Sequence, residues 1–358
     1  MDEGTKVRRA PPPVSLPHPN CPLRSFCAFV RVFSGESSRG HLFPSFVNPA
    51  ISPTIRPEIE VWLADFQLRL CQQLATADAG PAHFLTDTWQ RDGGGGGRSK
   101  VLEHGRILEK GGVGFSAVWG QMSEAAARQL HMPDPHFYAT GVSVVLHPRS
   151  PRVPIIHMNV RCFGAGNGEA WFGGGIDLTP IYVDETQARR FHERLRAVCD
   201  RHNPAYYPKF TRWADDYFYL PHRQETRGVG GIFFDRLTVG PDGSAEELFA
   251  FMRDVAELFG PFFTELMSEN HALPYAEREE SWQSLRRARY AEFNLAFDRG
   301  TRFGLETGGR TESILMSLPP RTGWAYNPAP PAPGSPEATT LAWLRKGVDW
   351  VETMKNGE

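Results

Sequence analysis

The segment from Gly141 to Pro180, GVSVVLHPRSPRVPIIHMNVRCFGAGNGEAWFGGGIDLTP, decides the fold of this chain. Its alternating side chains and its richness in β-branched residues predict three consecutive strands. The link PRSPRVP contains three prolines, so we interpret it as a turn between two of these strands. The predicted strands are Gly141–His147, Val153–Arg161 and Trp171–Leu178.

The first two strands are expected to share a polar face. A symmetric hairpin centred near Arg152 would place His147 opposite His157. Directly opposed residues point to the same face of a sheet. Alternation along the second strand adds Asn159 and Arg161 to that face.

The third strand combines a glycine run with a carboxylate. Gly173, Gly174 and Gly175 lie inside the strand, and a glycine in a strand often marks a point where another group approaches the backbone closely. Asp177 follows in an otherwise apolar strand, which makes it a candidate functional residue.

Composition limits the class of protein. The chain has 358 residues, of which 41% are hydrophobic, so it is long enough for a large core in one or two domains. The net charge of -2 gives no global basic field for nucleic acid. No apolar run approaches the roughly 18 residues that a transmembrane helix needs. The five cysteines are scattered without a C-x-x-C pair, which favours a reducing compartment over a disulfide or zinc framework: Cys21, Cys27, Cys71, Cys162 and Cys199.

Residues 1–54 differ from the rest of the chain. They are rich in proline, serine and arginine and show no sustained periodicity, so we expect a disordered or poorly ordered N-terminal arm, or an upstream start codon read in error. An organelle transit peptide has a similar composition and is the alternative. Residues 55–358 are expected to form a single domain.

Further elements are predicted between the N-terminal arm and the central strands. A first helix is predicted over Pro57–Ala77, because Trp62, Phe66 and Leu70 recur every four residues. The glycine run Gly93–Gly97 precedes two strand-like segments, and a flexible linker and a backbone cradle for anions are equally good interpretations of it.

Helices and strands follow in the second half of the chain. Strands in runs and helices in runs favour an α+β fold with a mainly antiparallel sheet over βαβ alternation. The predicted elements are a helix from Asp184 to His202, a strand Gly231–Leu237, a helix opened by Ser244 and interrupted at Pro261, a helix over 275–288, a strand Tyr290–Asp298, and a last helix from Ser335 to near Met354.

Histidine and arginine supply the candidate chemistry. His147 and His157 with Asp177 would make a two-histidine, one-carboxylate metal site, but the histidines lack compact ligand spacing and also suit hydrogen bonding or proton transfer. Arg161 and Arg299 lie in or at the end of predicted strands, and the planar guanidinium suits carboxylates. Generic salt bridges are the alternative for any one arginine.

Six strings in the right order connect this chain to a known family. They are GGGIDLTP, HMNVR, WADDYFYLPHR, RGVGGIFFD, YAEFNLAFDRGTRFG and GGRTESILMSLPP. Over residues 55–355 the chain resembles the oxygen-dependent coproporphyrinogen III oxidases of haem biosynthesis. The resemblance implies a flat antiparallel sheet between layers of helices, one catalytic domain, and a homodimer with contacts in segment 290–325. With the composition, it leads us to expect a cytoplasmic enzyme, or an organelle-targeted one if the arm is a transit peptide.

The resemblance also implies a reaction. It is the oxidative decarboxylation of two propionate side chains of coproporphyrinogen III to vinyl groups, which gives protoporphyrinogen IX. Oxygen is the electron acceptor, no organic cofactor is needed, and a divalent metal is not expected to be essential. A metal oxygenase and a non-catalytic tetrapyrrole carrier are the rival classes.

Site residues follow from the same resemblance. His157 corresponds to the proton donor of the family. Asp177 is expected to accept pyrrole N–H groups and to pair with Arg161 and Arg299 when the site is empty. The positions that match substrate-binding residues are Ser143, Asn159, Val160, Arg161, Gly308, Gly309 and Arg310. The buried charged cluster corresponds to Asp177, Arg161, Asp298 and Arg299. The ligand positions proposed for a metal in bacterial members correspond to His147, His157, His192 and His222.

Overall fold

The computed structural model describes residues 55–124, 127–128, 132–306 and 309–352. The predicted arm 1–54, Gly308 and Met354 therefore lie outside the described residues.

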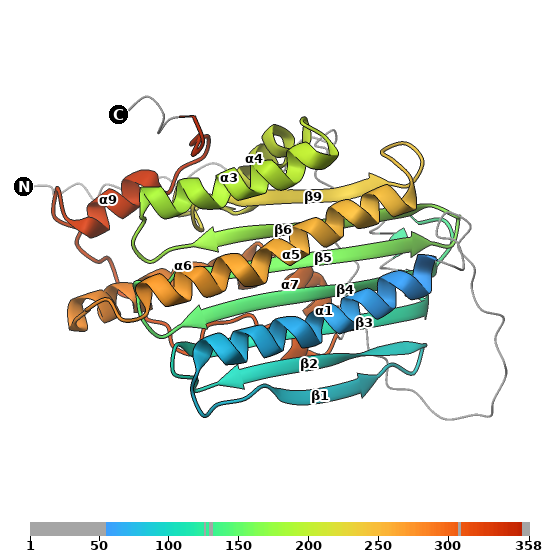
Figure 1. Cartoon of the computed structure of the whole chain (residues 1–358), viewed down its shortest axis with the longest axis horizontal. Coiled ribbons are helices and arrows are strands. Elements are labelled where there is room, and N and C mark those ends of the chain that lie inside the picture. Colours follow the sequence, from blue (N-terminus) through green and yellow to red (C-terminus); the bar gives the residue numbers. More distant parts are fainter. Residues whose placement is uncertain (1–54, 125–126, 129–131, 307–308, 353–358) are drawn as a thin grey trace, which may run out of the picture.

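A large antiparallel sheet runs through the described part of the chain (Figure 1). Its strand order is β1-β2-β3-β4-β5-β6-β9, and every neighbouring pair is antiparallel. The strands are β1 (Leu85–Gln90), β2 (Gly95–Glu103), β3 (Leu108–Gln121), β4 (His136–Pro148), β5 (Ile155–Ala165), β6 (Ala170–Thr179) and β9 (Gly231–Thr238). A short ribbon pairs β7 (Tyr219–Leu220) with β8 (Glu225–Thr226).

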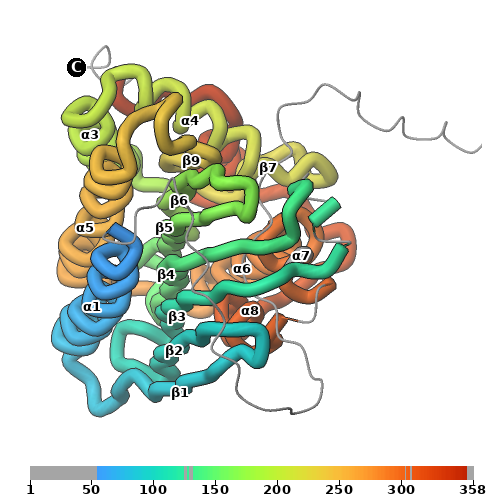
Figure 2. Tube along the Cα trace, turned by 90° about the vertical axis from the view of Figure 1, so that its right-hand side faces the viewer, coloured from blue at the N-terminus to red at the C-terminus, as the bar shows by residue number. Residues whose placement is uncertain are grey.

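Helices cover both faces of this sheet. Figure 2 shows α1 and α5 on one side and α6, α7 and α8 on the other, which confirms the predicted α+β class. The helices are α1 (Ile55–Asp78), α3 (Glu185–His202), α4 (Tyr206–Tyr217), α5 (Ala245–Asn270), α6 (Glu277–Ala296), α7 (Arg299–Glu306), α8 (Thr311–Leu315) and α9 (Pro336–Trp343).

The two faces of the sheet have different chemistry because side chains alternate along each strand. Val144, Met158 and Ile176 are fully buried and belong to the main hydrophobic core with α1 and α5. Their neighbours Ser143 and Asn159 point to the other face, toward α7 and α8. The apolar face holds the layers together, and the polar face is left to form a site.

The register of the central hairpin differs from the expected one by two residues. Val145, not His147, lies opposite His157, because the hairpin is centred one residue earlier than Arg152. His147 lies two positions beyond Val145 and so remains on the same face. On its other side, His157 is directly opposite Asp177.

The glycine run Gly93–Gly97 is neither a linker nor an anion cradle. It forms the turn of the β1–β2 hairpin and the start of β2, where Gly97 pairs with Trp89. Gly94 and Gly95 have φ values of 116° and 81°, which favour glycine. A Cβ at Gly97 would lie 2.3 Å from the Trp89 ring, so cross-strand packing requires glycine there.

The predicted strand Tyr290–Asp298 is wrong. Most of it is the end of α6, which continues from Glu277 to Ala296. Tyr290, Phe293 and Asn294 are buried, and their i, i+3, i+4 spacing is that of a helix. The same segment also alternates in polarity, and that alternation is the pattern that misled the prediction.

Two helix boundaries also differ from the prediction. Pro261 does not interrupt α5, because the proline lies on the exposed side of a helix whose other side is packed in the core. The last helix ends at Trp343 rather than near Met354. The predicted caps are confirmed: Asp184 accepts from the Gln187 backbone, and Ser244 forms a capping box with Glu247.

Candidate active site

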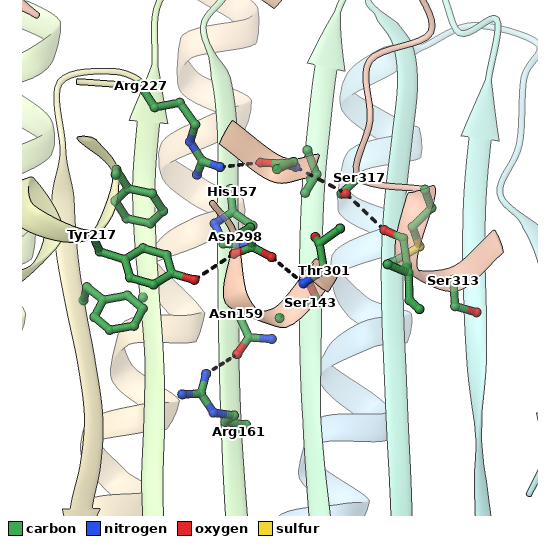
Figure 3. Close-up of a pocket in the computed structure, with 18 residues that line it drawn as sticks. Ser143, His157, Asn159, Arg161, Tyr217, Arg227, Asp298, Thr301, Ser313 and Ser317 are labelled. Atoms are coloured by element: carbon green, nitrogen blue, oxygen red, sulfur yellow. Dashed lines mark hydrogen bonds between the residues drawn. The ribbon is translucent and has the colours of Figure 1, made fainter. Parts of the chain in front are cut away.

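A cavity lies between the polar face of the sheet and the segment from α6 to α8 (Figure 3). The floor is formed by β4, β5 and β6, and the end of α4 and the segment after β8 close one side. The described lining consists of Ser143, Val145, His157, Asn159, Arg161, Gly175, Tyr217, Phe218, Arg227, Phe233, Asn294, Asp298, Gly300, Thr301, Ser313, Ile314, Met316 and Ser317.

The three glycines of β6 are needed for different reasons. Gly175 lines the cavity, where a bare backbone leaves room for a ligand. Gly173 makes room for side chains instead, since a Cβ there would lie 2.6 Å from Asp235 Oδ1 and 2.8 Å from Arg161 Nη2. Gly174 faces the core, where a Cβ would lie 2.9 Å from the Phe234 ring. The groups that approach the backbone of these glycines closely are therefore partly side chains of the protein itself.

His157 and Asp177 form a hydrogen-bonded pair beneath the cavity. The distance from His157 Nδ1 to Asp177 Oδ1 is 2.7 Å, and Arg227 Nη2 donates to Asp177 Oδ2 at 2.6 Å. Burial alone would raise the pKa of the Asp177 carboxyl, but the Arg227 charge and the His157 hydrogen bond lower it below its ordinary value. Asp177 is therefore an anion whose two oxygens are both engaged, and it is not among the lining residues.

Arg161 has a carboxylate partner of its own. Its Nη2 donates to Asp235 Oδ1 at 2.6 Å and its Nη1 donates to Asn159 Oδ1 at 2.9 Å. Burial raises the pKa of Asp235 even though Arg161 opposes the shift. The expected pairing of Asp177 with Arg161 and Arg299 is therefore corrected. The register places Arg161 opposite Gly173, which is four residues or about 13 Å along the strand from Asp177.

Asp298 is the carboxylate that lines the cavity. Its Oδ1 accepts from the Tyr217 hydroxyl at 2.8 Å, and its Oδ2 accepts from the Thr301 backbone at 2.7 Å. Burial and the adjacent Asp298 carboxylate raise the pKa of Tyr217 well above its ordinary value, so its hydroxyl is a donor at neutral pH. Arg299 does not line the cavity, and its backbone N–H contacts the Tyr217 hydroxyl at 3.4 Å.

The predicted substrate-binding residues separate into two groups. Ser143, Asn159 and Arg161 line the cavity. Val160 is fully buried in the core, because it lies between Asn159 and Arg161 and the alternation along the strand points it to the apolar face. Gly309 and Arg310 are not among the described lining residues, and the Arg310 guanidinium pairs with Asp87 on β1.

The four predicted metal positions lie in separate environments. His147 is buried, with Nε2 2.9 Å from the Ser317 carbonyl oxygen, and burial lowers its pKa to about 3. His192 lies between the Tyr207 hydroxyl and the Val229 carbonyl, and burial lowers its pKa to about 4.

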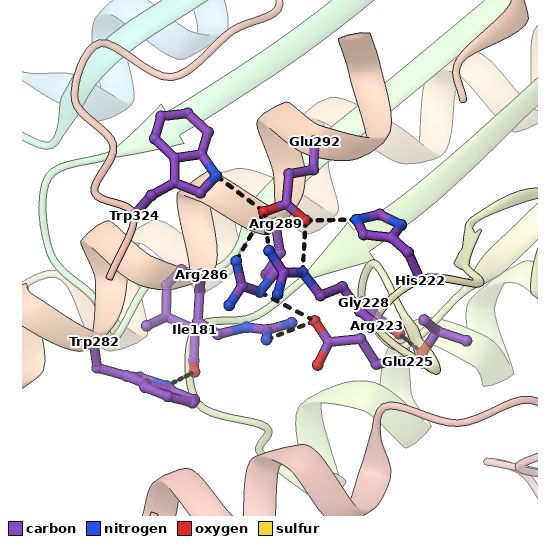
Figure 4. A network of polar contacts seen from close by, with 11 residues as sticks. Ile181, His222, Arg223, Glu225, Gly228, Trp282, Arg286, Arg289, Glu292 and Trp324 are labelled. Carbon is purple, nitrogen blue, oxygen red and sulfur yellow. Dashed lines mark hydrogen bonds and ion pairs between the residues drawn. The ribbon is translucent and has the colours of Figure 1, made fainter. Parts of the chain in front are cut away.

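His222 belongs to a polar network outside the cavity (Figure 4). Its Nε2 is 2.9 Å from Oε2 of Glu292. The other oxygen of this carboxylate, Oε1, accepts from Arg223, Arg289 and Trp324. Across the described ranges, no three histidine, cysteine, aspartate or glutamate side chains are grouped so as to hold a metal ion. The donor set therefore does not fit a resident transition metal at these four positions.

Several cavity residues were not among the predicted site residues. Tyr217, Arg227 and Asn294 come from segments far apart in the sequence, and only the folded chain brings them to one point. Arg227 had one visible signal, since it stands beside the glycines of RGVGG. Asn294 lies in the segment that was predicted to be a strand, and its direction into the cavity follows from its place on the helix α6.

The comparison with known families agrees with this arrangement. No helix in the described residues is long and apolar enough to cross a membrane. A family model described as coproporphyrinogen III oxidase matches residues 58–350, which includes every strand of the sheet and every described residue that lines the cavity. Because this match covers far more than half of the sequence, the chain belongs to the coproporphyrinogen III oxidase family.

Proposed function

We propose that this coproporphyrinogen III oxidase uses molecular oxygen to convert two propionate side chains of coproporphyrinogen III to vinyl groups, giving protoporphyrinogen IX. The activity and its place in porphyrin biosynthesis follow from the family. The observation that supports the proposed chemistry is one cavity that presents His157, Arg161 and Asp298 together.

The balance of each step defines what the site must do. A propionate carboxylate loses carbon dioxide as its C–C bond breaks, and the neighbouring carbon loses a proton, so two electrons leave the substrate. Oxygen takes up those electrons and two protons to form hydrogen peroxide. One proton comes from the substrate carbon, so the site must supply one more, and His157 is the residue we propose for this transfer.

Asp298 is the carboxylate that we propose for the pyrrole N–H groups. It faces the cavity, and each carboxylate oxygen can accept more than the one hydrogen bond described above. Its negative charge would stabilise positive charge that develops on the ring as electrons leave. Asp177 acts through His157, because both of its oxygens are engaged by protein groups.

The carboxylates of the substrate require cationic and polar partners. We propose that Arg161, Ser143 and Asn159 hold a propionate near His157, since all three line the floor of the cavity. Gly309 and Arg310 are proposed to bind a second propionate, and Arg310 would exchange Asp87 for the substrate. Gly308, which the resemblance adds to this group, lies outside the described residues.

We propose that the reaction does not require a transition metal. The support is the scattered placement of His147, His192 and His222, because His157 is the one of the four histidines that is among the described lining residues. Metal analysis of the purified protein distinguishes this proposal from the metal oxygenase. Stoichiometric metal, with activity lost to a chelator and restored by the metal, would overturn it.

The assembly and location are further parts of the proposal. We propose a symmetric homodimer that uses segment 290–325, in which Leu295 and Trp324 are 47% and 57% exposed. The network around Glu292 anchors this surface through the Trp324 indole (Figure 4). We also propose a cytoplasmic enzyme whose single catalytic unit is residues 55–358, with organelle targeting by residues 1–54 as the alternative.

Product analysis with and without oxygen tests the function. The purified chain is incubated with coproporphyrinogen III in air, in air with a chelator, and under strict anaerobiosis. Protoporphyrinogen IX should form in the first two conditions and not in the third. Anaerobic turnover would contradict oxygen dependence, whereas binding without any product would indicate the non-catalytic carrier.

A further inference from the structure

Arg227 is a buried cation with aromatic walls. Its side chain is 3% exposed, and its guanidinium carbon lies 4.4 Å from the Phe218 ring centroid, 4.5 Å from that of Tyr290 and 4.7 Å from that of Phe293. The backbone N–H of Arg227 donates to the Phe218 carbonyl at 2.8 Å. Rings on several sides attract the cation and exclude water, so the guanidinium is held in one place.

The polar contacts of Arg227 form a chain that ends at His157. Its Nη1 donates to Asn294 Oδ1 at 2.8 Å, and its Nη2 donates to Asp177 Oδ2 at 2.6 Å. The other oxygen of Asp177 lies 2.7 Å from His157 Nδ1. Figure 3 shows Arg227 and His157 near each other in the cavity that both residues line. A network from α6 thus reaches the imidazole through one arginine and one carboxylate.

The charge of Asp177 decides which nitrogen of His157 carries a proton. An ionised carboxylate can only accept, so Nδ1 must donate and Nε2 is the nitrogen left for a bound molecule. The proton that His157 supplies is therefore one that Nε2 has first taken up. A neutral carboxyl in the same place could donate to Nδ1, which would reverse the tautomer. Burial favours the neutral carboxyl, and the Arg227 cation is the largest influence that opposes it, with the His157 hydrogen bond second.

We propose that Arg227 is a positioning residue that keeps Asp177 anionic and thereby fixes the protonated nitrogen of His157. This inference rests on the proposed role of His157 as the proton donor. The rival interpretation is that Arg227 binds a substrate propionate directly. The position of Arg227, almost fully covered and already bonded to Asp177 and Asn294, favours the first role.

Other ionisable groups act on the same pair. Tyr290 on α6, Asp298 before α7 and His147 on β4 all interact with Arg227 or Asp177. Burial raises the pKa of Tyr290 and lowers that of His147, so both are neutral near pH 7. Asp298 is the remaining acid, and it favours the cationic form of Arg227.

The direct test is the tautomer of His157 in the substrate-free full-length protein. Nitrogen NMR of histidine-labelled enzyme, with His157→Gln to assign the signal, should show the proton on Nδ1 in the wild type. Arg227→Gln should abolish that preference, whereas Arg227→Lys should retain it in part. The matched control is Arg287→Gln, which removes another buried arginine, paired with Glu109 at 2.7 Å, and should leave the His157 signal unchanged. An unchanged signal in Arg227→Gln would overturn the proposal, and this readout does not depend on turnover.

Kinetics separates positioning from substrate binding. Without the cation, the pKa of Asp177 rises, so the anion that activity requires exists only at higher pH. The acidic limb of the kcat profile of Arg227→Gln should therefore move to higher pH by about one unit or more, which lowers kcat about tenfold on that limb. A KM raised about tenfold with an unchanged pH profile and tautomer would show a propionate clamp instead. If Arg227→Gln does not fold, Asn294→Ala tests the same chain by removing the second anchor, with a smaller shift in the same direction expected and no shift contradicting it.

Discussion

Two buried carboxylates of the site are each paired with an arginine. Asp177 has Arg227, and Asp235 has Arg161, so each buried ion has an opposite charge at 2.6 Å. This pairing is needed because an isolated buried charge is very costly. Asp298 lines the cavity without an arginine within hydrogen-bonding distance among the described residues, and its partners are a hydroxyl and a backbone amide. The cavity therefore suits N–H donors and developing positive charge.

Asp177→Asn tests the link between this residue and turnover. The amide would keep the size of the side chain but direct an N–H toward His157 Nδ1, which forces the imidazole into the other tautomer. We expect kcat to fall by about two to four orders of magnitude, as for the loss of a tautomer-fixing or preorganised electrostatic group. KM should change less, because Arg161 and Ser143 remain. Steady-state kinetics and circular dichroism measure this, and near-normal turnover in a folded variant would remove Asp177 from the mechanism.

The buried histidines predict loss of stability in acid. His192 has a pKa of about 4 in the folded protein, below its ordinary value of 6.5, so the unfolded chain binds its proton more tightly. Stability from this residue is full above pH 6.5 and decreases as the pH falls toward 4. At pH 5 the loss is about 2 kcal/mol. Denaturant unfolding at pH 7.5 and pH 5 should show it, and His192→Gln should reduce the difference by about that amount. An identical pH dependence in both proteins would argue against a neutral buried His192.

Packing of α8 and of the residues after it against the sheet positions the segment that covers the cavity. Met316, just after α8, sits over β3, where a Cβ at Gly112 would lie 3.0 Å from its sulfur, and Ser313 contacts Ser99 on β2 at 2.9 Å. Because Gly112 has no side chain, Met316 and α8 can approach the sheet closely.

Gly112→Val should push Met316 and α8 away from the sheet. We expect destabilisation of about 1–3 kcal/mol from overpacking, together with a lower kcat. Gly112→Val combined with Met316→Ala should recover part of both losses, because the smaller side chain frees the space. Thermal unfolding and kinetics of the single and double variants check this, and purely additive losses would show that the two residues are not in contact.

Local sequence patterns correctly predicted the elements in which the pattern agrees with the observed packing. The strands β4 to β6, the helix α1 and the caps Asp184 and Ser244 follow from alternation, helical spacing and side-chain chemistry. The prediction for segment 290–298 failed because its residues fit both the two-residue period of a strand and the 3.6-residue period of a helix. Only burial of Tyr290, Phe293 and Asn294 against the site selects the helix.

The site was predictable only within single strands. His157, Asn159 and Arg161 share a face by strand parity, so they could be placed from the sequence, and all three line the cavity. The register that pairs Asp177 with His157, and the return of Arg227 to the same point, depend on contacts between distant segments. Local sequence does not record such contacts, so the partners of Asp177 were assigned wrongly.

The whole molecule is expected to function as a dimer. Segment 290–325 exposes Leu295 and Trp324, and adjacent Tyr326 is fully exposed, which is costly for a monomer in water. Light scattering at micromolar concentration should give twice the mass of the 40.1 kDa chain. Trp324→Ser should shift the equilibrium toward monomer, whereas Leu68→Ser, at an exposed position of α1 on the other face of the sheet, is the control. A monomer alone in the wild type would contradict the prediction.

The proposed reaction of this cavity is a two-electron oxidation by oxygen in which His157 supplies a proton. The most direct measurement is the stoichiometry of oxygen consumed, carbon dioxide released and peroxide formed by metal-free enzyme acting on coproporphyrinogen III. We predict a ratio of one to one to one for each vinyl group, and His157→Gln should lower all three rates together while the variant still binds substrate. Carbon dioxide release without oxygen uptake, or full activity in a folded His157→Gln variant, would contradict the account.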